Sequence, residues 1–142
     1  KNLYFLYLGK SKSENAPGLI HLLAITSQVK YYEPYEARAS RCIFRIDRDR
    51  YPFFASDCLI DLDVAYHETT AEYVRAAQIE KVGSFDLQDL SLIFNKMVEA
   101  GTLSPNILNK ISTRLTETGC ENLRPVVSNR ATRAKRAKKT TD

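Results

Sequence analysis

Histidine and cysteine, the side chains that most often bind transition metals, are scarce in this chain of 142 residues. Its three cysteines, Cys42, Cys58 and Cys120, are widely spaced without a pattern, so they predict neither a disulfide framework nor paired metal ligands. The two histidines, His21 and His67, do not make a metal cluster. We therefore expect reduced thiols in a cytoplasmic protein, with no metal and no cofactor.

Long apolar runs and catalytic signature motifs are missing as well. No apolar run approaches the ~18 residues of a membrane-spanning helix and no signal peptide is visible, so we expect no membrane partner. The chain has no Gly-rich phosphate loop, no HExxH sequence and no nucleophile elbow. Standard cofactor and metal chemistry is therefore disfavoured.

Positive charge is concentrated near the C-terminus. The net charge is +4, but residues 124–142 hold seven basic residues and one acidic residue, a net of +6, which leaves −2 for residues 1–123. Such a segment either binds phosphates by releasing counterions or is a solvated tail that only adds solubility. We expect a body over residues 1–119 and a basic, disordered tail over 120–142. The tail residues proposed to contact nucleic acid are Arg130, Arg133, Lys135 and Arg136.

The first half of the chain has the pattern of short strands. Strands are predicted where apolar or alternating residues run between turn residues, at Leu3–Leu8, Leu19–Ile25, Arg41–Asp47, Tyr51–Phe54 and Cys58–Val64. Residues 69–82 are ambiguous, because Thr69 and Glu72 fit the capping box of a helix whereas Val74–Val82 fit a strand equally well. Short strands at this close spacing predict a small antiparallel barrel rather than a parallel sheet.

Two amphipathic helices follow the strands. The first is expected to begin at Ser84 or Asp86 and to end at Gly101, and the second to begin at Ser104 and to stop near Gly119. Neither is long enough to be stable alone, so both must pack on the strands. The sequence thus predicts a mainly β fold with C-terminal helices. The apolar stripes are Leu87, Leu90, Phe94, Met97 and Val98 in the first helix and Ile107, Leu108, Ile111 and Leu115 in the second.

Polar and aromatic side chains at strand ends are the candidates for a binding site. Thr26 and Ser27 end a hydrophobic strand, where their hydroxyls either project into a cleft or bond the strand terminus. Tyr31 and Tyr32 either stack on unpaired bases or pack as a partly buried loop. Arg45 lies on a charged strand face that contacts a phosphate backbone or discourages aggregation.

Three other residues complete the candidates. Lys10 and Lys12 lie in a turn-rich segment, residues 9–18, and are expected to contact nucleic acid. His21 lies inside an apolar strand, and this position favours a core or interface histidine over a general base.

The order of these segments resembles the MazF/PemK family of toxin endoribonucleases. The resemblance covers roughly residues 1–115 and depends on order and spacing, because each motif is weak by itself. The segments that carry it are Leu3–Leu8, a variable turn, Ile25-Thr26-Ser27, the run Asp57–Leu62, and Val82-Gly83-Ser84 before Leu87–Val98.

The resemblance implies an SH3-like barrel packed by terminal helices, usually as a homodimer. It also implies metal-independent cleavage of single-stranded RNA and neutralisation by an antitoxin protein. The family's catalytic Thr or Ser carries over to Thr26 or Ser27, and its arginine falls at or upstream of Lys1, the candidate cation here. Lys10, Lys12 and Arg45 are the alternatives for that cation.

An interaction module is the alternative function. In that case the barrel is a non-catalytic scaffold, and the basic C-terminal tail binds nucleic acid or an acidic partner. Deleting residues 124–142 distinguishes the two hypotheses, because a module loses its binding whereas an enzyme keeps residual cleavage.

Overall fold

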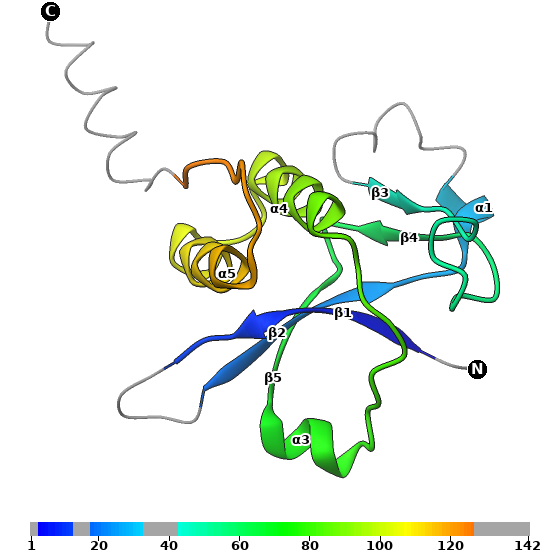
Figure 1. The fold of residues 1–142 in the computed structure, drawn as a ribbon, viewed down its shortest axis with the longest axis horizontal. Helices are drawn as coiled ribbons and strands as arrows, with labels where there is room; N and C mark the ends of the chain where they lie inside the picture. The colour runs from blue at the N-terminus through cyan, green and yellow to red at the C-terminus, as the bar shows by residue number, and fades with distance from the viewer. Residues whose placement is uncertain (1–2, 13–17, 33–42, 127–142) are drawn as a thin grey trace, which may run out of the picture.

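The computed structural model describes residues 3–12, 18–32 and 43–126 as two small antiparallel sheets with helices (Figure 1). The first sheet has the strand order β1-β2-β5, and the second pairs β3 with β4. The elements are β1 (Tyr4–Lys10), β2 (Leu19–Ile25), α1 (Val29–Tyr32), β3 (Ile43–Ile46), β4 (Cys58–Asp61), β5 (Tyr66–Thr70), α3 (Ala71–Ala76), α4 (Leu87–Ala100) and α5 (Pro105–Thr118).

A backbone bridge joins the two sheets. Thr26, directly after β2, exchanges two backbone hydrogen bonds of 2.9 Å with Leu59 of β4. The order of antiparallel strands followed by helices agrees with the prediction from the sequence, but the fold is mixed rather than mainly β, because its helices hold more residues than its strands. Within the described residues the strands form these two sheets and no closed barrel.

The predicted strand at Tyr51–Phe54 is wrong. These residues form turns, in which the Phe54 N–H bonds the carbonyl of Tyr51 at 3.2 Å. Tyr51 stacks on Phe85 with ring centroids 4.4 Å apart, and Phe54 is buried beside it. Because these rings are buried on the same side, the segment does not alternate its side chains as a strand does.

The segment after β4 resolves the ambiguity over residues 69–82. Strand β5, which was not predicted, ends at Thr70 and leads into α3, so the helix interpretation is confirmed for residues 71–76 and the alternative strand at Val74–Val82 is wrong. The cap is Thr70 rather than Thr69, because the Thr70 hydroxyl accepts a hydrogen bond of 3.2 Å from the Tyr73 N–H.

The two long helices confirm the predicted pair. The Ser104 hydroxyl accepts a bond of 3.3 Å from the Ile107 N–H at the start of α5. Gly101 and Gly119 end the helices in the left-handed region, with φ of 67° and 114°. Leu87 is an error in the predicted stripe, because it lies at the edge of the core in the first turn of α4 and is 42% exposed.

Helix α5 packs on β1 of the first sheet and α4 contacts β3 of the second, and both helices share one core with the strands (Figure 1). We call the side of the β1-β2-β5 sheet that faces this core the inner face and the opposite side the outer face. Leu8 and Leu23 project from the inner face into a core shared with Phe94 and Ile111, all at most 2% exposed. Burial of each such side chain stabilises the fold by about 1.5–3 kcal/mol. The helices therefore fix the strands from one side, whereas Phe5 and Tyr7 on the outer face of β1 stay exposed.

The segment that follows α5 packs against α4. Asn95 donates to the carbonyl of Asn122 and accepts from the Arg124 N–H at 2.7 Å, while Arg124 pairs with Glu99 at 3.0 Å. Cys120 is buried. Residues 120–126, the described part of the expected tail, thus belong to the body. Within the described residues, no helix combines the length and the apolar character needed to cross a bilayer.

Candidate nucleic-acid interface

The outer face of the β1-β2-β5 sheet carries exposed aromatic side chains. Phe5 and Tyr7 alternate along β1 with the buried Leu6 and Leu8, and they are 38% and 58% exposed. Phe5 meets His67 of β5 edge to face, with ring centroids 6.0 Å apart. Exposed rings on an open sheet are the groups on which unpaired bases stack.

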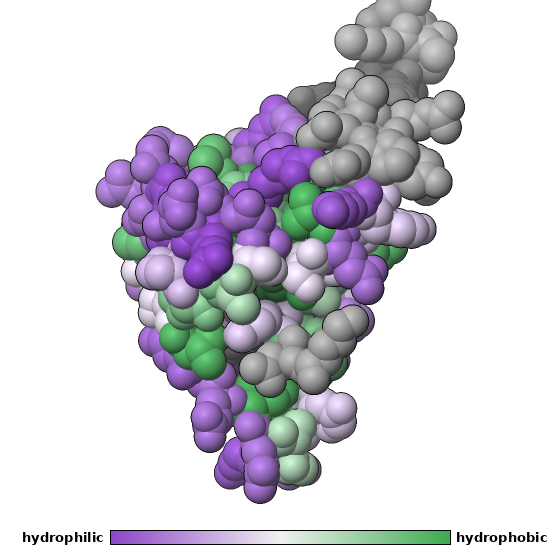
Figure 2. Space-filling view, turned by 90° about the vertical axis from the view of Figure 1, so that its right-hand side faces the viewer, coloured by the Kyte–Doolittle hydropathy of each residue, from purple (hydrophilic) through white to green (hydrophobic). Residues whose placement is uncertain are grey.

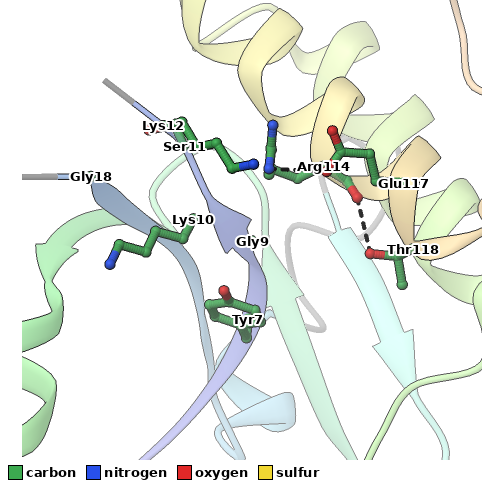
Figure 3. Close-up of a pocket in the computed structure, with 9 residues that line it drawn as sticks. All are labelled: Tyr7, Gly9, Lys10, Ser11, Lys12, Gly18, Arg114, Glu117 and Thr118. Atoms are coloured by element: carbon green, nitrogen blue, oxygen red, sulfur yellow. Dashed lines mark hydrogen bonds and ion pairs between the residues drawn. The ribbon is translucent and has the colours of Figure 1, made fainter. Parts of the chain in front are cut away.

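A groove lies beside β1, the edge strand of this sheet, between the β1–β2 hairpin and the C-terminal half of α5 (Figure 3). We call it the hairpin groove, and its volume is about 780 Å³. Its lining includes the cations Lys10, Lys12 and Arg114, the acidic Glu117 and the ring of Tyr7. Three cations against one acid favour an anionic ligand.

Glycine allows the groove to form. A β-bulge at Tyr7 and Gly9 shifts the register of β1, and Gly9 adopts a φ of +126°. A Cβ atom on Gly9 would lie 2.6 Å from the Cβ of Arg114, so only glycine lets α5 approach β1 so closely. The guanidinium of Arg114 is then held by an ion pair of 2.9 Å with Glu117. The groove thus has at least one cation in a defined position.

Beyond the other end of β2, the hydroxyl of Thr26 and the guanidinium of Arg45 belong to residues that pair with the same residue of β4. Arg45 of β3 pairs with Leu59 of β4, and Leu59 pairs with Thr26. Directly opposed residues of antiparallel strands share a face, so these three side chains project to the same side. Two strand spacings, about 10 Å, separate Thr26 from Arg45. We call Thr26, Leu59 and Arg45 the Thr26 row.

The immediate surroundings of the Thr26 row are polar and aromatic. The Thr26 hydroxyl accepts a hydrogen bond of 3.2 Å from the Gln28 N–H, which confirms the strand-terminus bond and leaves the O–H able to donate. Burial, followed by the charge of Asp61 and a hydrogen bond to it, raises the pKa of Tyr32, so this phenol stays protonated at neutral pH. Figure 2 looks onto this end of the molecule, where hydrophobic patches lie among hydrophilic surfaces and Tyr31 is 65% exposed.

The structure divides the predicted site residues between the two ends of β2. Thr26, Tyr32 and Arg45 lie at one end, and Lys10 and Lys12 lie at the other. The seven residues of β2 separate the ends by about 20 Å. Ser27 is exposed directly after Thr26. The remaining predicted site residues lie outside the described part of the chain: Lys1, Arg130, Arg133, Lys135 and Arg136.

Sequence reasoning missed two charged residues of these sites, Arg114 and Asp61. Arg114 lies next to Leu115 and three residues after Ile111, at the border of the apolar stripe of α5, where a long side chain reaches the neighbouring element. Asp61 ends a buried strand and lies two residues from Leu59, so it shares the face of the Thr26 row. Both signals exist in the sequence, but their partners depend on the tertiary fold.

His21 lies on the inner face of β2 and is fully buried. Its Nδ1 lies 2.6 Å from the Tyr66 hydroxyl, which in turn donates to Glu68 at 2.9 Å. Its Nε2 has no hydrogen-bond partner among the described residues. Desolvation lowers the pKa of His21, so the ring is neutral and the core interpretation is confirmed. The same residues contain no group of three side chains arranged to hold a metal ion.

Comparisons with protein-family models, with curated proteins and with solved structures find no match for this chain. The resemblance to the MazF/PemK family therefore stays a prediction.

Proposed function

We propose that the protein binds single-stranded RNA on its outer face and cleaves it at the Thr26 row without a metal. The observation that carries this proposal is the register of Thr26 with Arg45, which flank Leu59 of β4 and share one face. Metal-free RNA cleavage needs a cation to stabilise the charge that develops on the phosphate. The guanidinium of Arg45 supplies that charge, and the Thr26 hydroxyl donates to a phosphate oxygen.

The proton transfers are assigned to the residues beside the row. A carboxylate takes the proton of the RNA 2′-hydroxyl, O2′ bonds to phosphorus, and the P–O5′ bond breaks as O5′ gains a proton. Asp61 is the proposed base and Tyr32, which stays protonated because its pKa is raised, is the proposed acid. The products are a 2′,3′-cyclic phosphate and a free 5′-hydroxyl. The hydrogen bond between Tyr32 and Asp61 provides the path that returns the proton for the next cycle.

The direct test is cleavage of a long RNA in the presence of EDTA. Replacing Thr26 and Ser27 together by alanine is expected to reduce the cleavage rate by about 100-fold or more, since a phosphate donor is lost. Thr113→Ala is the matched control, because Thr113 is an exposed threonine on α5, far from the row in the chain. Unchanged cleavage by the folded double variant would exclude the Thr26 row as the reaction centre.

The proposal also includes the SH3-like barrel, the homodimer and the antitoxin that the resemblance implies. Light scattering of the purified protein checks the dimer. Removal of residues 127–142 should leave cleavage at the Thr26 row intact, because the described residues already contain the groups assigned to the reaction.

A further inference from the structure

We propose that the hairpin groove is a second phosphate-binding site, which holds the backbone of the same RNA strand about 20 Å from the Thr26 row. The inference deepens the proposed function and depends on it only for the identity of the ligand as RNA. It assigns to the protein a minimum substrate length, because a strand must span both ends of β2 to use both sites.

The cations of the groove form a local cluster on an otherwise acidic body. Residues 1–123 carry a net charge of −2, so three groove cations near one acid are not a general property of the surface. In Figure 3 the side chain of Lys12 extends from the hairpin toward Arg114 on α5. A phosphate between them would accept hydrogen bonds from the ammonium and the guanidinium together.

The surface between the two sites fits a nucleic-acid strand better than a small anion. Tyr7 lines the groove and also stands on the outer face, where Phe5 is the next outward side chain toward Thr26. Bases that stack on these rings would carry the strand along β1, with phosphates at either end. Single-stranded sites on small β domains commonly span about 4–16 nucleotides, which is sufficient for this distance.

The test measures binding without any cleavage. Fluorescence anisotropy in EDTA uses labelled 2′-O-methyl RNA of about three and about twelve nucleotides, in which the attacking hydroxyl is blocked. The double variant Lys12→Gln with Arg114→Gln is compared with Lys110→Gln, which removes one charge from the same helix outside the groove. If the double variant fails to fold, the single variant Lys12→Gln still tests the groove, because Lys12 is exposed and its replacement should not disturb the fold.

The expected result depends on length. For the twelve-nucleotide probe, the double variant should raise Kd roughly tenfold and reduce the salt dependence of log Kd by about 1.4, which corresponds to two phosphate contacts. Lys12→Gln alone should produce about half of that change in slope. The three-nucleotide probe and the Lys110→Gln control should behave as the unmodified protein does.

Three outcomes would overturn the inference. One is equal weakening of both probes, and another is equal weakening by Lys110→Gln. The third is a groove that binds inorganic phosphate, with loss in the double variant, while the long probe binds unchanged; the groove would then be a small-anion site. Since no readout involves cleavage, length-dependent binding by a protein that never cleaves RNA would contradict the proposed function alone.

Discussion

The hairpin groove and the Thr26 row lie at opposite ends of strand β2 and are built in different ways. The groove combines side chains from a hairpin and from α5, and it exists because Gly9 lets Arg114 pack against β1. The row is set by backbone pairing of Thr26, Leu59 and Arg45, which fixes the register and the face of these residues without contacts between their side chains. A site made by tertiary packing should therefore be more sensitive to remote substitution than a site made by strand register.

The largest expected effect comes from Gly9→Ala. The new methyl group meets the Cβ of Arg114 at 2.6 Å and is forced into a positive φ, so the free energy of unfolding should fall by about 3 kcal/mol. Gly101→Ala is the control, since Gly101 has a positive φ of +67° but no close neighbour, and it should cost only about 1 kcal/mol. Urea titration measures both. Equal losses in the two variants would show that packing of α5 does not shape the groove.

The second-largest effect is expected from a substitution in the Thr26 row. Arg45→Gln should reduce the rate of RNA cleavage by about 100-fold, because the proposed cation is lost from the reacting phosphate. Its effect on Kd for a twelve-nucleotide probe should stay within about threefold if the hairpin groove supplies much of the affinity. Arg48→Gln, an exposed arginine just beyond β3, is the matched control and should keep the full rate. If both variants cleave equally, Arg45 is not the catalytic cation.

The same contrast explains how much the sequence could predict. The helices α4 and α5 and strand β2 follow from periodicity, caps and glycines, which act within a few residues. Strand β5 was missed because its Tyr-His-Glu-Thr-Thr sequence lacks a clear apolar face, and its place is set by pairing with β2. Arg114 was missed because its place in the groove also depends on a distant residue, Gly9, which lies more than a hundred residues away in the chain.

A smaller effect is expected from pH at the hairpin end. Burial lowers the pKa of His21 below its usual 6.5, Lys110 lowers it further and Glu68 opposes this. The unfolded chain therefore binds the proton at a higher pH than the folded protein. The stabilising contribution of the neutral ring is fully present above about pH 6.5 and is lost as the pH falls below that value.

Urea titrations between about pH 8 and pH 5 check this expectation. The loss of unfolding free energy on acidification should shrink in His21→Gln and persist in His67→Gln, a change of the exposed histidine on β5. Because His21 pairs with Gly9, hydrogen exchange at low pH should accelerate at Gly9 before it does at Thr26. Equal acceleration at both ends would mean that the two regions open as one unit.

The smallest expected effect is a gain in RNA affinity rather than a loss. Glu117→Gln removes the single acid among the charged groove residues and frees Arg114 from its ion pair of 2.9 Å, so a twelve-nucleotide RNA should bind about threefold more tightly. Glu99→Gln provides the control, because Glu99 also pairs with an arginine, Arg124, but lies on α4 outside the groove. Anisotropy at low salt shows the difference most clearly, since salt screens it. If Glu117→Gln weakens binding instead, the ion pair orients Arg114 toward the phosphate. The orientation of the guanidinium would then matter more for RNA affinity than the loss of the negative charge of Glu117.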